Sequence, residues 1–230
     1  MDYMKVNLVS YSTPAADFEA EGVDNVQELI AFCARVSNPS NQINSETSDK
    51  LIRYLVRNQH WSPLEMVSAC LEIETTRDIA RQMLRHRSFS FQEFSQRYAN
   101  PVEDLAFVTR DARLQDTKNR QNSVSLKDTE MTGEEQTALD QAWRSKQDSV
   151  ILAADKAYQW AIKNGIAKEQ ARAVLPEGLT KSRLYMNGTL RSWVHYIELR
   201  SANGTQLEHM EIAKECAKVI AEVFPLATTL

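Results

Sequence analysis

The chain has 230 residues, of which 43% are hydrophobic and 25% are charged, and its formal net charge is −4. This composition is typical of a folded globular protein and argues against intrinsic disorder. It also argues against a general nucleic-acid binder, because such proteins usually carry a basic face.

No apolar run approaches the roughly 18 residues of a membrane span, and the first residues, MDYMKVNLVS, lack the pattern of a signal peptide. We therefore expect a cytoplasmic protein that does not bind membranes. The cysteines Cys33, Cys70 and Cys216 are far apart, and we expect buried, reduced thiols rather than disulfides. The four histidines show no His-x-x-x-His spacing, so no metal site is predicted.

The first half of the chain alternates between the two-residue period of strands and the 3.6-residue period of helices. The expected strands are residues 5–11 (KVNLVSY) and 66–74 (MVSACLEIE), and the expected helices begin at about 25 and span about 48–58. Asp24 is a suitable N-cap for the first of these helices. Thr75 or Thr76 is expected to cap a further helix that begins near Arg77.

The second half is mainly helical, after a polar and poorly periodic segment at about 100–133 that predicts a long excursion. The expected elements are a long helix at about 134–164, a short helix before Pro176, a strand at 180–186 (TKSRLYM), and helices at about 189–200 and 205–224. Gly165 is expected to end the long helix. The whole pattern predicts an α+β fold, with a small mixed or antiparallel sheet packed with several helices. We expect a single domain over 1–230, with an insertion-like segment at about 103–153.

Residues 85–98 (RHRSFSFQEFSQRY) gather basic, aromatic and hydroxyl side chains on a chain that is acidic overall. Continuing the preceding helix through this segment would pair Arg81 with Arg85, Gln82 with His86, and Ile79 with Met83 toward the core. Cations at the C-terminal end of a helix have an ordinary explanation, because they stabilise its dipole. The rings and hydroxyls that follow favour instead a cradle for a phosphorylated ligand with a planar ring, because guanidinium groups bind phosphates bidentately.

The same segment carries a family resemblance. RHR, seven further residues and then Ser resemble the signature of the flavin-dependent thymidylate synthases. Similar family segments follow in order and spacing: HWSPLE (60–65), ARAVLP (171–176), MNGTLRSWVHYIELR (186–200) and the region of Gln206 and Glu208. The chain departs from the family pattern at Gln92, where Asn is usual, and at Met66, where many members have a second His.

The resemblance implies an enzyme in which NADPH reduces FAD, methylenetetrahydrofolate donates a one-carbon unit, and dUMP becomes dTMP. It implies FAD contacts by Ser62, Arg85, His86, Arg87, Glu93, Thr189, Leu190, Arg191 and His195. It implies dUMP contacts by Gln82, Met83, Leu84, Arg85, Glu93, Phe94, Ser95, Gln96, Arg97, Arg172 and Arg200. The family builds its sites at the interfaces of a homotetramer, so several of these residues are expected to come from different copies.

The resemblance also gives Arg200 the catalytic role. A cation against the carbonyl and N3 edge of a pyrimidine favours the anionic form, which makes C5 nucleophilic without a cysteine. On sequence alone, Arg200 would be a helix C-terminal charge, and His60 and His195 would be ordinary half-buried histidines. Two other classes stay open: a non-catalytic nucleotide or nucleic-acid binding protein, and an enzyme of another chemistry on this fold.

Overall fold

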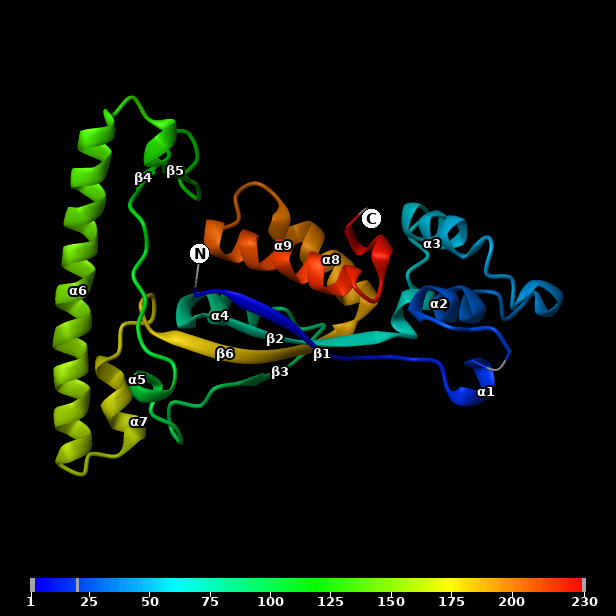
Figure 1. Cartoon of the computed structure of the whole chain (residues 1–230), viewed down its shortest axis with the longest axis horizontal. Coiled ribbons are helices and arrows are strands. Elements are labelled where there is room, and N and C mark those ends of the chain that lie inside the picture. The colour runs from blue at the N-terminus through cyan, green and yellow to red at the C-terminus, as the bar shows by residue number, and fades with distance from the viewer. Residues whose placement is uncertain (1–2, 20, 229–230) are drawn as a thin grey trace.

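A computed structural model describes residues 3–19 and 21–228 and shows a small antiparallel sheet with helices packed on it (Figure 1). The strand order is β1 (Lys5–Tyr11), β2 (Ser68–Thr76), β6 (Lys181–Thr189) and β3 (Ser90–Glu93). Every pairing in this sheet is antiparallel, so the mixed alternative does not apply. A separate two-stranded hairpin consists of β4 (Arg113–Gln115) and β5 (Ser123–Ser125).

The central strands have one apolar and one polar face, because side chains alternate across a strand. In β2, Leu71 and Ile73 are fully buried, while the intervening Glu72 lies on the other face. There Glu72 accepts a hydrogen bond from the Tyr185 hydroxyl of β6 at 2.8 Å. The polar face is therefore held by cross-strand polar pairs, and the apolar face is available for helices.

The helices are α1 (Ala16–Glu19), α2 (Val26–Ala34), α3 (Ser48–Arg57), α4 (Arg77–Met83), α5 (Pro101–Asp104), α6 (Gly133–Lys163), α7 (Lys168–Ala171), α8 (Leu190–Ser201) and α9 (Leu207–Ala221). Helices α4, α8 and α9 lie on the same side of the sheet (Figure 1). Their fully buried side chains include Ile79, Met83, Trp193, Tyr196 and Ile212, which form one core with the apolar face. The α+β prediction is confirmed, and Ile79 and Met83 face the core as expected.

Several element boundaries differ from the sequence prediction. The N-cap of α2 is Asn25 rather than Asp24, and its side chain accepts a hydrogen bond from the Glu28 amide at 3.0 Å. Strand β2 begins at Ser68, two residues after the predicted start, because a 3-10 turn over Ser62–Glu65 precedes it and Met66 is its C-cap. The last helix is shorter than expected at both ends, and strand β3 was not predicted.

The long helix α6 is defined by signals at both ends. Thr132 and Glu135 form a reciprocal capping box at its start. At its end Gly165 has φ +74°, and the amides of Gly165 and Ile166 donate to the carbonyls of Ile162 and Ala161, which is a Schellman motif. The helix stands along one edge of the molecule, beside α5, α7 and the β4–β5 hairpin (Figure 1).

Other sequence expectations concern cysteines, metals and membranes. All three cysteines are free thiols, but Cys33 and Cys70 are only half-buried, so complete burial was correct for Cys216 alone. Within residues 3–19 and 21–228, no group of three or more His, Cys, Asp or Glu side chains is placed to hold a metal ion. None of the helices in this described part is both long and apolar enough to span a bilayer.

Candidate active site

The basic segment does not continue helix α4. The helix ends at Met83 with Leu84 as its C-cap, so Arg85 and His86 lie beyond it and the predicted helical pairs with Arg81 and Gln82 are wrong. The chain must turn here, because β3 runs back along β6 and begins only at Ser90. The cations do gather at the end of the helix, as the sequence indicated.

A central group of polar side chains lies where α4, α8 and α9 meet. The Arg200 Nε–H donates to His86 Nε2 at 2.9 Å, so this nitrogen is an acceptor and the His86 proton belongs on Nδ1. Burial, then the charges of Arg200 and Arg85, lower the pKa of His86 to about 4. His86 is therefore neutral at pH 7. The Arg200 guanidinium is held by its Nε, which leaves its two terminal nitrogens for a ligand.

The network continues from Gln82 to His209 and Tyr196, neither of which was predicted as a site residue. His209 Nδ1 lies 3.3 Å from Gln82 Oε1, and its Nε2 lies 3.1 Å from the Tyr196 hydroxyl. Gln82 Oε1 can only accept, so His209 carries its proton on Nδ1 and Tyr196 donates to Nε2. Gln82 Nε2 in turn donates to Gln206 Oε1 at 2.8 Å, which fixes the orientation of the Gln82 amide.

His209 is fully buried, and burial, followed by the charges of Arg200 and His86, lowers its pKa to about 3. A neutral histidine is therefore built into the core directly behind Gln82 and Tyr196. The only sequence signal for it is a histidine in the apolar pattern of the last helix, which more often indicates ordinary packing.

A second group lies at the start of α8, near the Thr189 end of β6. Thr189 is the N-cap of α8, and its hydroxyl accepts from the Ser192 amide at 3.3 Å. Arg191 forms an ion pair with Glu65. The His195 ring meets Trp61 edge-to-face at a centroid distance of 4.4 Å. These contacts place the partly exposed side chains of Arg191 and His195 on one surface.

Other residues of the predicted flavin set differ in exposure. Ser62 lies in the 3-10 turn beside this group and is exposed, whereas the Leu190 side chain is fully buried. Arg85 and Arg87 are exposed, and neither forms an ion pair with any residue that the structure describes. His60 is exposed rather than half-buried, so that expectation was wrong for His60 and correct for His195.

A third group follows β3 at the other end of the sheet. Glu93 accepts from the Ser182 hydroxyl at 2.8 Å and lies 3.4 Å from the Arg77 guanidinium. Arg97 forms an ion pair with Glu169 at 3.2 Å.

The remaining members of the predicted dUMP set that follow Glu93 lie close to this group. The Phe94 amide donates to the Arg183 carbonyl at 2.8 Å, and Ser95 is half-buried. Gln96 is buried, and its Nε2 has no hydrogen-bond partner among the described residues. Arg172 is half-buried in the 3-10 turn that follows α7.

The predicted site residues thus fall into separate groups along the sheet. Strand β6 spans the nine residues Lys181–Thr189. At about 3.3 Å per residue, its two ends lie about 25 Å apart. Arg191 and His195 lie by the Thr189 end, whereas the chain after Glu93 continues toward the Lys181 end. Arg191 and His195 of the flavin set thus lie toward the opposite end of β6 from the part of the nucleotide set that follows Glu93.

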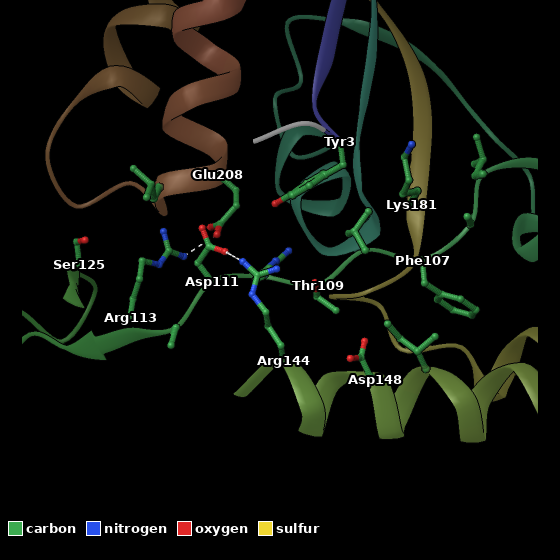
Figure 2. A pocket seen from close by; sticks show the side chains of 17 residues that line it. Tyr3, Phe107, Thr109, Asp111, Arg113, Ser125, Arg144, Asp148, Lys181 and Glu208 are labelled. Carbon is green, nitrogen blue, oxygen red and sulfur yellow. Dashed lines mark hydrogen bonds and ion pairs between the residues drawn. The ribbon is translucent and has the colours of Figure 1, made fainter. Parts of the chain in front are cut away.

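A cavity of about 1050 Å³ lies between α6, the segment before β4 and the start of α9 (Figure 2). None of the residues in the predicted flavin or dUMP sets lines it. Its cations are already paired: Arg113 with Glu208 at 2.6 Å, Arg110 with Asp78 at 2.7 Å, Arg144 with Asp111, and Lys181 with Glu74 at 3.5 Å. The first three pairs tie the long excursion to α9, α4 and α6, and the fourth joins β6 to β2.

Glu208 joins this cavity to the central group. Its carboxylate accepts from Arg113 and, at 3.0 Å, from Gln206 Nε2. Burial raises the pKa of Glu208, but the hydrogen bond and charge of Arg113 outweigh this and lower it overall. Glu208 is therefore a buried carboxylate that stays ionised and positions Gln206.

Comparisons with known proteins agree on one family. A family profile described as thymidylate synthase complementing protein matches residues 21–226. The probable flavin-dependent thymidylate synthase of Paramecium bursaria Chlorella virus 1 is 46% identical over 222 residues, with 96% of each chain covered. The flavin-dependent thymidylate synthase of Synechocystis sp. is 42% identical over 222 residues, again with 96% of each chain covered.

A solved structure is similar over nearly the same length. The UMP/dUMP methylase PolB from Streptomyces cacaoi, bound with 5-Br dUMP, superposes with a TM-score of 0.77 at 26% sequence identity. The alignment covers 97% of this chain and 92% of that one. The likeness therefore extends over nearly the whole fold.

Proposed function

The chain belongs to the thymidylate synthase complementing protein family, and on this premise we propose that it is a flavin-dependent thymidylate synthase. It methylates dUMP to dTMP, with methylenetetrahydrofolate as carbon donor and NADPH as reductant of FAD. The family match over residues 21–226 carries this proposal. In this chain, the hydrogen bond from Arg200 to His86 orients the guanidinium that would act on the pyrimidine.

The exposed residues of the flavin set fit FAD. The cofactor carries two phosphates, and guanidinium groups without intramolecular partners are suited to bind them. Arg85 and Arg87 meet this condition within the described chain. We propose that they hold FAD together with Ser62, His86, Glu93, Thr189, Arg191 and His195. Leu190 is buried, so its side chain would support the flavin site by packing the start of α8 onto the core. When bound, FAD supplies the hydride that completes the methyl group.

We propose that Arg200 activates the pyrimidine. His86 holds the guanidinium through Nε, so its terminal N–H groups can face the carbonyl and N3 edge of the base. Positive charge there favours the anionic form of the ring and places electron density at C5. Because His86 is neutral at pH 7, it accepts this hydrogen bond and does not repel Arg200. No cysteine acts as a nucleophile, and the pKa of the buried Cys216 thiol is raised by desolvation, which keeps it protonated.

The nucleotide would be held from two sides. Gln82, Met83, Leu84, Arg85 and Arg200 belong to the group at the end of α4, and Glu93, Phe94, Ser95, Gln96, Arg97 and Arg172 belong to the group after β3. Arg172 of the second group suits the phosphate, and so does Arg97, because its exposed ion pair with Glu169 is weak enough for a phosphate to replace. We propose that these halves come from different copies of the chain in a homotetramer. The separation of the groups along β6 supports this arrangement.

We also propose that the chain acts as a single domain in the cytoplasm. The family match spans nearly its whole length, and its three free cysteines suit a reducing compartment.

The visible spectrum of the purified protein tests the proposed function first. We expect a flavin band that anaerobic NADPH bleaches, faster with dUMP than without it. Arg200→Ala should retain the flavin band and lose dTMP formation by at least about 100-fold, because one electrostatic contact to a developing charge supplies on that order. A colourless protein that takes up no added FAD, or an Arg200→Ala variant with wild-type turnover, would refute the corresponding part of the proposal.

A further inference from the structure

Helix α6 carries an apolar row that its own chain leaves uncovered. The buried residues of the helix are Gln147, Ala154, Tyr158 and Ala161, which define the face packed on the body. Beside that face lie Leu139, Trp143, Val150 and Trp160, with exposed fractions of 36%, 45%, 49% and 62%. Several exposed large apolar side chains along one side of a helix are typical of an interaction surface.

The row has the spacing of a coiled-coil seam. Lys146, Ala153 and Ala157 fill the gaps between its members, so that successive positions are separated alternately by four and three residues. This spacing keeps the seam on one side of a helix over several turns. The two alanines leave room for large side chains, and the Lys146 stem can cover apolar surface while its ammonium group stays in water. We call these seven residues the α6 seam.

The charges beside the seam select the partner and its direction. The exposed flanking positions are Glu135, near the start of the helix, and Lys156 and Lys163, toward its end. A second copy lying antiparallel would bring each Glu135 next to the partner's Lys163, twice by symmetry. A parallel pair would instead align like charges and both helix dipoles. The seam is thus complementary to itself in the antiparallel direction.

The large and small residues of the seam agree with this direction. If the two helices cross near Asp148, Trp143 faces the partner's Ala153 and Leu139 faces the partner's Ala157. Large residues then meet small ones on both sides of the crossing point. Helix α6 stands along one edge of the molecule (Figure 1), and the large apolar residues of the seam are exposed there.

We propose that the α6 seam is an interface between two copies of this chain, formed by antiparallel pairing of the two α6 helices. This inference deepens the proposed self-association, and it rests on the proposed function only for the existence of an oligomer. It assigns one pairing surface to a helix that contributes none of the residues proposed for flavin or dUMP binding.

The first test measures the mass of the assembly by light scattering after size-exclusion chromatography, at about micromolar protein. We expect Trp143→Glu/Trp160→Glu to lower the mass of the wild-type assembly about two-fold. Leu152→Glu is the matched control, because Leu152 is 55% exposed on α6 but lies outside the seam. An unchanged mass for the double variant, or an equal loss for the control, would overturn the proposal.

A second test does not depend on weakening the interface. Ser149→Cys places a thiol near the crossing point in both copies, and a short bismaleimide should link two chains through position 149. Ser145→Cys, one turn earlier and further from the seam, is the control. Peptide mapping by mass spectrometry separates these links from any through Cys33 or Cys70. No link at position 149, or equal links at both positions, would refute the antiparallel pairing.

The flavin spectrum and dUMP turnover of the same preparations distinguish the two proposals. If the wild-type protein is coloured and active, and the assembly of the double variant has the same mass as the wild-type assembly, only the α6 interface is refuted. A monomeric wild-type protein that converts dUMP refutes both the interface and the homotetramer. A colourless wild-type protein that takes up no FAD refutes the proposed function, while the mass and cross-linking results still decide whether the seam pairs.

Discussion

Acid should destabilise this protein through His209, and removing the imidazole should reduce that sensitivity. His209 is fully buried and neutral, with a pKa of about 3 in the folded chain. In the unfolded chain its pKa is about 6.5. Because the folded pKa is the lower one, the unfolded state binds more protons below pH 6.5. The contribution of His209 to stability is therefore complete above about pH 6.5 and is lost as the pH falls toward 3.

The magnitude follows from the two pKa values. Between pH 7.5 and pH 5.0 the unfolded state gains nearly one proton at His209, while the folded state gains almost none. Linkage gives a loss of about 2 kcal/mol in the free energy of unfolding over this interval. His86 has a pKa of about 4 and titrates in the same direction; because it is partly exposed, solvent screening reduces its share.

The assay is urea unfolding of the holoprotein at pH 7.5 and pH 5.0, at one protein concentration, followed by tryptophan fluorescence. The loss of stability between the two pH values should be about 2 kcal/mol smaller in His209→Phe than in the wild type. His209→Gln is a second variant that keeps polar contacts, and His60→Gln is the control at an exposed histidine. The reasoning is refuted if all four proteins lose the same free energy between the two pH values.

Two further predictions concern single contacts in the core and behind the site. A Cβ at Gly188 would overlap the ring of Phe89, so Gly188→Ala should cost about 1–3 kcal/mol of stability, measured by thermal unfolding. Phe89→Leu should restore part of that loss, and an unchanged melting temperature in Gly188→Ala would contradict the steric argument. Arg113→Met leaves the buried Glu208 carboxylate without its ion-pair partner and should cost about 3 kcal/mol in urea unfolding. Arg113→Met/Glu208→Leu should recover most of it, and a double variant less stable than the single one would count against the pairing.

Local signals in the sequence were sufficient for several elements. The alternation at residues 5–11 predicted β1 with its observed bounds, and Gly165 ends α6 through the positive φ that the prediction required. Asp24 and Asn25 are both good capping residues, so the choice between them depended on which side chain the fold directs to the Glu28 amide. Three-residue strands such as β4 and β5 carry too little pattern to be read from sequence.

The site was harder to predict than the elements, because it depends on pairing between distant segments. Helix α4 ends early, since the next residues must reach the edge of β6, and the local charge pattern contains no sign of that constraint. The contact between Arg200 and His86 joins positions 114 residues apart. The role of His209 became visible only once Gln82 and Tyr196 were placed on either side of its ring. Motif spacing identified the family, but the hydrogen bonds behind the motif required the fold.

Strand β3 gives the spacing of the basic motif a physical meaning. Arg85–Arg87 precede the strand and Ser95 follows it. The seven residues between them include all of β3, which pairs with β6, so their number sets the distance between the basic residues and Ser95. From Ser90 to Glu93 the strand spans about 10 Å, in a register fixed by Ser90 opposite Asn187 and Glu93 opposite Leu184. Deleting one residue from β3 would shorten this distance and also turn every later side chain to the opposite face. The number of residues in the motif therefore sets one distance within the proposed binding site.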